Sequence, residues 1–280
     1  MNASEFLYTV VCRPAPIRWV VNRLILAFLP SSVLIGRADV LLNPHDPVVS
    51  GALAMGVYEK EEISLFSRTI QPGMTVVDVG ANLGAYSIVA LDRLQGRGQL
   101  LAVEPARENF LLLQRNLEHN QRLSQKTKVH AARVALSNKS GVAVLHKNPA
   151  NKGDNRLYSD GLLAGKEKVK TMTLDNLCGQ KGIRSIDVLK IDVQGLEGEV
   201  LLGSRKILQA SQPCYLFFEF WAEGLIKAKS EPPRILELIK SLGFNLYTYS
   251  RGSLSPIRVS TLVRQTLGRK YTNIYGVKRE

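Results

Sequence analysis

Cysteine is scarce in this chain of 280 residues, which has three: Cys12, Cys178 and Cys214, far apart in the sequence. Three scattered cysteines form neither a disulfide framework nor a metal cluster, and they fit a reducing compartment, so we expect a cytoplasmic protein. His-rich and acidic clusters are also missing, and we therefore expect no bound metal. Internal repeats and low-complexity tracts are absent as well. The length then predicts one large α/β domain with an appendage.

Long apolar runs are missing too. The best candidate spans residues 17 to 35, but Arg18 and Arg23 interrupt it, and its uncharged part from Leu24 to Gly36 has 13 residues. A membrane-spanning helix needs about 20 predominantly apolar residues, so no transmembrane segment is expected. The first residues include Glu5 and no basic stretch. We therefore expect no secretory signal peptide.

The sequence predicts an N-terminal extension, helical or irregular, over residues 1–50 and the main domain over residues 51–280. Within the extension, Trp19, Leu24, Leu26 and Phe28 offer apolar bulk close to two arginines. Two interpretations fit this segment: a helix packed on the main domain, or a helix lying in a membrane interface. The second would place a cytoplasmic protein peripherally at a membrane.

Acidic residues are outnumbered, with 24 Asp and Glu against 37 Lys and Arg and a formal net charge of +13. Such a surface suits an anionic partner: a glycan, phospholipid head groups or nucleic acid. Lys166, Lys168 and Lys170 alternate as on one face of a strand. The basic clusters do not interleave with aromatic residues as single-strand binding platforms do, so nucleic acid is not favoured. A solvated basic surface that aids solubility is the simpler alternative.

The most informative segment begins at a short apolar strand, residues 75–79, that carries Asp78 near its end. A turn with Gly80 and Gly84 follows, and then a segment able to start a helix. Glu104 closes a second apolar strand twenty residues past Gly84. Strand, glycine turn, helix, strand and acid form the layout of a doubly wound nucleotide site.

The residues in and before this turn indicate which nucleotide ligand it binds. A dinucleotide fingerprint has three glycines, whereas here Asn82 stands between Gly80 and Gly84, and Asn tolerates left-handed backbone. The Asp78 carboxylate would repel a pyrophosphate but suits the ammonium group of S-adenosylmethionine (SAM), whose ribose diol can donate hydrogen bonds to Glu104. The alternative is an ordinary strand-to-helix turn with a chance acid.

Alternation of helix and strand along the rest of the chain predicts a mostly parallel sheet with helices on both faces. We expect helices at residues 59–70, 107–121, 196–208 and 232–242. We expect core strands at 75–79, 99–105, 129–136 with a hairpin partner at 141–146, 169–174, 186–192 and 214–220, and closing antiparallel strands at 245–249 and 271–277. Residues 153–165 are polar and contain glycine, which predicts a mobile loop.

Several ordered sequence blocks resemble the FkbM family of SAM-dependent methyltransferases over roughly residues 52–278. The blocks are Gly56–Glu59, Val77–Gly84, Val103–Pro105 with Asn109, Phe110 and Asn116, Ala135–Ser137, Thr173–Asp175, and Leu189–Gly195 with Glu197. The resemblance implies a Rossmann-like class I methyltransferase fold, SAM as donor, and usually a hydroxyl acceptor on a polyketide, sugar or glycolipid. One position departs: the family pattern after the fourth strand usually reads Asp-x-Glu-Gly, and this chain has Gln194 in place of the glutamate.

A hydroxyl acceptor needs a general base or a polarising neighbour. Asp192, at the carboxyl end of the fourth strand, is the first candidate, because doubly wound sheets bind ligands at that edge. Glu219 ends the fifth strand and Glu59 opens a helix that could cover the donor. The alternatives are structural: helix capping for Asp192, a first-turn position for Glu59, and an ion pair for Glu219. The adenine is expected near Val134 and Ala135, through backbone contacts.

Three functions remain in competition. The first is an O-methyltransferase acting on a small-molecule or glycan acceptor, for which the basic surface suits an anionic one. The second is an RNA or protein methyltransferase, favoured by charge alone, because the segment Asp192–Gly195 lacks the Pro-Pro-aromatic loop that grips a flipped base. The third is a non-catalytic SAM-binding protein that docks on membranes. No motif specifies the acceptor or an oligomeric state.

Overall fold

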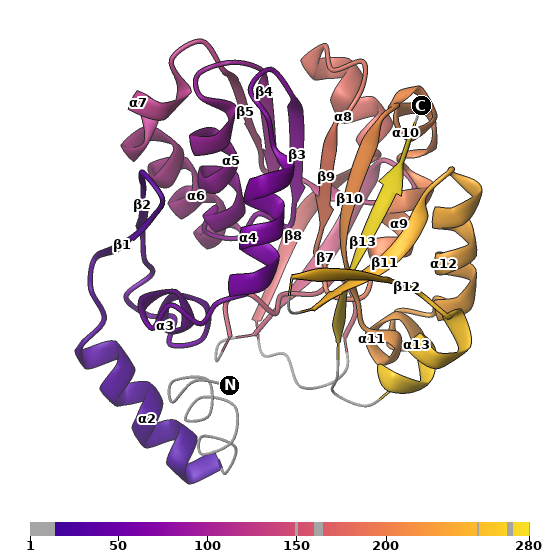
Figure 1. Ribbon diagram of the computed structural model, residues 1–280. Helices are drawn as coiled ribbons and strands as arrows, with labels where there is room; N and C mark the ends of the chain where they lie inside the picture. Colours follow the sequence, from indigo (N-terminus) through magenta and orange to yellow (C-terminus); the bar gives the residue numbers. More distant parts are fainter. Residues whose placement is uncertain (1–14, 149–150, 160–164, 251, 268–270, 280) are drawn as a thin grey trace.

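A computed structural model describes residues 15–148, 151–159, 165–250, 252–267 and 271–279. Its central sheet has, within those ranges, eight strands in the order β12-β11-β13-β10-β9-β3-β4-β5. Five neighbouring strands are parallel: β3 (Thr75–Val79), β4 (Gln99–Val103), β5 (Lys128–Ala132), β9 (Val188–Ile191) and β10 (Cys214–Phe220). Three antiparallel strands extend the sheet beyond β10: β13 (Thr272–Lys278), β11 (Asn245–Ser250) and β12 (Ser253–Pro256). The predicted mostly parallel sheet is confirmed (Figure 1).

Helices cover both faces of this sheet because each core strand buries side chains on both sides. Val76 packs with helices α4 (Lys60–Thr69) and α5 (Ala85–Leu94). Its neighbour Val77 faces the opposite core, as the two-residue period of a strand requires. That second core is covered by α8 (Leu174–Lys181), α9 (Glu197–Leu202), α10 (Arg205–Ala210) and α12 (Pro232–Ser241). The remaining helices of the main domain are α6 (Arg107–His119), α7 (Gln121–Ser124), α11 (Ala222–Lys227) and α13 (Val259–Gln265).

The predicted strand at residues 129–136 is wrong in extent. Strand β5 ends at Ala132, and β6 (Ala135–Leu136) belongs to a separate three-stranded sheet with β8 (Gly165–Met172) and β7 (Gly141–Lys147). The expected hairpin partner of the third strand therefore pairs with β8 instead. Arg133, the first residue after β5, is exposed to solvent, and the chain is buried from Val134 to Leu136.

Two further boundaries differ for local reasons. Leu174, expected to end a strand, opens α8, because the hydroxyl of Thr173 accepts a hydrogen bond from the backbone N–H of Asn176 and caps the helix. The helix expected over 196–208 is divided into α9 and α10 at Gly203, where any Cβ would overlap the carbonyl oxygen of Ser137. The expected mobile loop at 153–165 includes residues 160–164, which lie outside the described residues.

The N-terminal extension contains helix α2 (Ala15–Ala27) and a hairpin that sequence patterns did not indicate, β1 (Ser32–Ile35) with β2 (Ala38–Leu41), and helix α3 (Val49–Ala54) crosses its predicted boundary at residue 50. Two side-chain amides, one within α6 and one directly after it, hold this hairpin. Asn116 accepts from the backbone N–H of Leu41 at 2.7 Å, and Asn120 accepts from that of Asp39 at 2.9 Å. Helix α2 lies at the periphery, away from the sheet (Figure 1). Across the described residues, no helix is long and apolar enough to cross a membrane.

Candidate active site

The loops that follow β3 and β9 touch at the carboxyl edge of the sheet, and this contact requires a glycine. Gly80 has φ +80°, and a Cβ built on it would overlap the carbonyl oxygen of Asp192. Asn82 also adopts a left-handed conformation, with φ +52°, as its predicted place in the glycine turn requires. Gly84, at φ +98°, opens α5 where a Cβ would crowd Leu113.

Glu104 closes the opposite side of this loop. Its Oε2 accepts from the backbone N–H of Asn82 and its Oε1 from that of Ala106, both at 2.9 Å. Burial raises the pKa of Glu104 to about 7 despite these two hydrogen bonds. The carboxylate still lines a cavity, where its remaining lone pairs can accept hydrogen bonds from hydroxyl groups. Val134 and Ala135 line the same cavity, in the segment where the chain leaves β5.

The sequence predicted that the Asp78 carboxylate holds the ammonium group of SAM, but the structure places this side chain outside the cavity lining. Its side chain is fully buried and does not line the cavity. Oδ2 accepts a hydrogen bond from the hydroxyl of Ser87 at 2.7 Å, while Oδ1 has no partner among the described residues. Burial raises the pKa of this carboxyl, and the nearby Lys190 ammonium opposes that shift. Asp78 therefore lies behind the loop, where its side chain has no direct access to the cavity.

Sequence analysis did not assign a role to Lys190, whose side chain is almost fully buried at the centre of the site. Its Nζ lies 3.2 Å from Asp192 Oδ2 and 4.5 Å from the centre of the Tyr86 ring. Burial lowers the pKa of Lys190, but the carboxylates of Asp192, Asp78 and Glu59 outweigh it and raise the pKa above its usual value. In the sequence, a lysine within the otherwise apolar run 188–191 indicates a buried charge that needs acidic partners.

Gln194 links the two carboxylates proposed as bases. Its Nε2 donates to Asp192 Oδ1 at 2.8 Å and to Glu219 Oε2 at 2.9 Å. The backbone of Gln194 has φ +56°, and Glu197 holds the loop by accepting from the backbone N–H groups of Val193 and Gly195. Burial raises the pKa of Glu219 well above its usual value, and the charges of Asp192 and Glu197 add to that shift.

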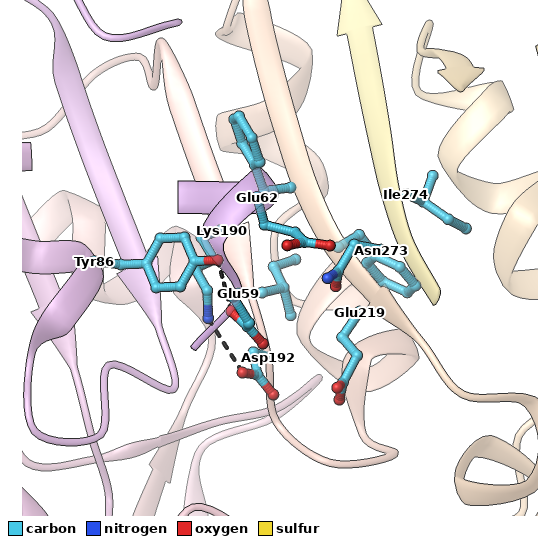
Figure 2. Close-up of a pocket in the computed structure, with 11 residues that line it drawn as sticks. Glu59, Glu62, Tyr86, Lys190, Asp192, Glu219, Asn273 and Ile274 are labelled. Carbon is cyan, nitrogen blue, oxygen red and sulfur yellow. Dashed lines mark hydrogen bonds and ion pairs between the residues drawn. The ribbon is translucent and has the colours of Figure 1, made fainter. Parts of the chain in front are cut away.

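Glu59 reaches the same place from the start of α4. It has φ +39°, and its Oε2 accepts from the hydroxyl of Tyr86 at 2.6 Å. Burial raises the pKa of Glu59 to about 7, and Lys190 opposes the shift. Figure 2 shows the carboxylates of Glu59, Asp192 and Glu219 gathered around Lys190 and Tyr86. The structure therefore brings all three predicted bases together.

The three acids open into a cavity of about 1350 Å³ that extends to the glycine loop and Glu104. Pockets for one small ligand commonly measure about 300–1,000 Å³, so this cavity has room for two. Its outer wall includes Trp221, with the Arg156 guanidinium 5.0 Å and the Lys227 ammonium 5.8 Å from the ring. Across the described residues, no group of three or more His, Cys, Asp and Glu is arranged to hold a metal ion.

The residues around the glycine loop and Glu104 suit SAM. The loop at Gly80 leaves backbone where a side chain would close the approach, and the carboxylate of Glu104 lines the same cavity. Asp78 adds negative charge behind the loop, which suits the ammonium of a methionine moiety. The residues fit this cofactor, which supplies an electrophilic methyl group when it is bound.

The sheet order, the glycine loop after β3 and the carboxylate after β4 define a class I SAM-dependent methyltransferase fold. The family model described as "Methyltransferase FkbM domain" matches residues 78–246, more than half of the chain. The chain therefore belongs to the FkbM methyltransferase family, and the resemblance inferred from sequence blocks is confirmed.

Individual relatives are distant. Methyltransferase sdnD of Sordaria araneosa is 28% identical over 222 residues, 67% of this chain and 79% of that protein. The 2-O-methyltransferase NoeI of Sinorhizobium fredii is 26% identical over 198 residues, 65% of this chain and 76% of that protein. A crystal structure of methyltransferase FkbM from Methylobacillus flagellatus KT aligns with 93% of this chain and 59% of its own, at 13% identity and a TM-score of 0.43.

Proposed function

We propose that this protein transfers a methyl group from SAM to a hydroxyl group of a sugar, glycolipid or related secondary metabolite. The observation that carries the proposal is the Asp192–Gln194–Glu219 arrangement, two carboxylates joined by one amide in the cavity that also contains the glycine loop. A hydroxyl is a weak nucleophile until its proton is removed or shared, and adjacent carboxylates can take that proton.

The acceptor proton passes to the Asp192–Glu219 pair. Lys190 and Gln194 hold Asp192 through both of its oxygens. Gln194 Nε2 donates to Glu219 Oε2, and the acceptor hydroxyl can deliver its proton to the Glu219 carboxylate. Because both carboxylates accept a hydrogen bond from the same Gln194 nitrogen, they lie close enough together for either one to take the proton. Glu59 and Tyr86 close the donor side and exclude water.

The cavity wall supports a sugar or glycan as acceptor. A sugar has apolar ring faces and hydroxyl edges, which match the aromatic surface of Trp221 and the cations beside it. Lys152 and Lys227 also line the cavity and favour a glycan that carries negative charge. NoeI is named as a 2-O-methyltransferase, and that name also favours a hydroxyl acceptor.

Isotope transfer tests the proposal. The protein is incubated with methyl-labelled SAM and separate panels of saccharides, glycolipids, RNA and proteins, and products are identified by mass spectrometry. We expect label as a methyl ether on a saccharide or glycolipid, and Asp192→Asn to lower the rate by about 100-fold or more. The matched control is Glu237→Gln on the exposed face of α12, with an unchanged rate. Label on RNA or protein alone, or SAM binding with no transfer to any panel, would refute the proposal.

A further inference from the structure

Helix α2 has two faces with different surroundings. The inner face packs on the domain: a Cβ built on Gly51 of α3 would lie 2.8 Å from Ile25 Cγ2, so the Ile25 side chain already occupies that space. Asn22, on the same inner side, lines the cavity. The outer face is apolar and open to solvent, with exposed fractions of 60% for Trp19, 54% for Leu24 and 83% for Phe28.

The exposed side chains form one stripe. Trp19, Val20, Arg23, Leu24 and Phe28 are all exposed. Trp19 and Arg23, Val20 and Leu24, and Leu24 and Phe28 are each four residues apart, which places them along one side of α2 and of the residue that follows it. The Arg23 guanidinium lies over the Trp19 ring, 4.5 Å from its centre. Phe28 is the most exposed large apolar side chain among the described residues. A contiguous exposed apolar stripe of this kind marks a surface that binds another protein or a membrane.

The charge of the segment around the stripe favours an anionic bilayer over a second copy of the chain as its binding partner. From residue 6 to residue 38 the sequence has four arginines and no acidic residue, within a chain of net charge +13. Two copies of so basic a chain repel each other, whereas an anionic bilayer attracts each of them. A Trp and an Arg on an otherwise apolar face are also typical of helices in the headgroup region, because both side chains have an apolar body and a polar end.

We infer that α2 docks the protein on an anionic lipid surface, lying in the plane of the interface with Trp19, Leu24 and Phe28 inserted. The helix has 13 residues, too few to span a bilayer of about 30 Å at 1.5 Å per residue. Because Asn22 of the same helix lines the cavity, the docked protein presents the cavity mouth near the lipid surface. This inference goes beyond the proposed function and does not depend on methyl transfer.

Vesicle binding tests the inference with the full chain. Sedimentation is measured with vesicles of phosphatidylcholine and phosphatidylglycerol and with vesicles of phosphatidylcholine alone. We expect wild type to bind the anionic vesicles more tightly. The triple variant Trp19→Gln, Leu24→Gln, Phe28→Gln should lose about 100-fold in partitioning, because three apolar side chains no longer leave water. Arg23→Gln should lose about fivefold on anionic vesicles alone.

A matched control removes apolar surface elsewhere. Leu111→Gln, Val142→Thr and Leu254→Gln alter exposed side chains on α6, β7 and β12, and this variant should bind vesicles as wild type does. Unchanged thermal unfolding of both triple variants shows that they fold. In a Trp221→Phe background, Trp19 is the remaining tryptophan, and its emission should shift to the blue on adding anionic vesicles.

Three results would overturn the inference. Wild type could fail to bind anionic vesicles, or the α2 triple variant could bind as tightly as wild type. In the third, light scattering shows that wild type is a dimer in solution and that the α2 variant is a monomer, with no vesicle binding by either. That result would assign the stripe to a second copy of the chain.

Discussion

The side-chain amide of Gln194 donates a hydrogen bond to Glu219, from Nε2 to Oε2, at 2.9 Å. The same nitrogen donates to Asp192, so one neutral amide satisfies two carboxylates that would otherwise face each other. The family pattern usually has a glutamate at this position. An ionised glutamate could not donate either bond, and the departure in this chain therefore creates a different proton arrangement at the site.

Replacing Gln194 by Glu tests this arrangement. The added carboxylate would raise the pKa of Glu219 further, because a third negative charge disfavours its ionised form. Glu219 would then lose its proton only at higher pH. We expect the rising limb of the pH–rate profile to move up by about one pH unit and the rate at neutral pH to fall by about tenfold. Gln121→Glu, on exposed α7, should leave the profile unchanged. An identical profile for Gln194→Glu would show that Gln194 does not act on the pair.

Gly80→Ala should abolish SAM binding. The new methyl group would overlap the carbonyl oxygen of Asp192, and Ala would also be strained at φ +80°. The two loops must separate, at a cost of about 2–4 kcal/mol in the free energy of unfolding, and the cofactor surface is lost with them. Calorimetric titration with SAM and thermal unfolding measure the two effects. Gly179→Ala is the matched control, since its Cβ would meet nothing within 4 Å. Normal SAM affinity in Gly80→Ala would contradict the assigned role of the loop.

Stability of the ligand-free protein should fall as pH rises from about 4.5 to about 7. Burial raises the pKa of Glu104 to about 7, so within this window the folded state holds a proton that the unfolded state has released. The shift from 4.5 corresponds to about 3 kcal/mol, fully lost above pH 7. Glu104→Gln should therefore flatten the pH dependence of unfolding by denaturant. Glu118→Gln, on the exposed side of α6, should not. A Glu104→Gln curve parallel to wild type would show that Glu104 does not carry the dependence.

Lys190→Met should destabilise the site strongly. The side chain would keep its bulk but lose the positive charge 3.2 Å from Asp192 Oδ2, and buried carboxylates would remain unpaired. Removing one partner from a buried ion pair costs about 3–5 kcal/mol. Because Lys190 also lowers the pKa of Glu59 and Asp78, both should rise in the variant. Denaturant unfolding measures the loss, with exposed Lys128→Met as control. Wild-type stability in Lys190→Met would contradict the central place given to this lysine.

Local sequence patterns were sufficient for the strands and turns that carry the nucleotide loop. The apolar run 75–79, its glycines and the acid after the next strand depend on neighbours within a few residues, and β3 and β4 are found where they were expected. The two carboxylates were predicted one at a time, because Asp192 follows the apolar strand β9 and Glu219 lies near the end of the apolar strand β10. Parallel strands bring their carboxyl ends to one edge of the sheet, so Asp192 and Glu219 could both be predicted as site residues without knowledge of their contact through Gln194.

The sequence alone thus determined the family, the order of the core strands and the edge where ligands bind, because these follow from short-range periodicity and from glycine and acid spacing. Tertiary structure decided which side chains meet there. It placed Glu59 beside Tyr86 and buried Lys190 among three acids. It also buried Asp78 behind the glycine loop, outside the cavity lining. It also assigned β7 to β8 and added the hairpin of β1 and β2. Those choices depend on contacts between segments far apart in the chain, whose energies no local pattern contains.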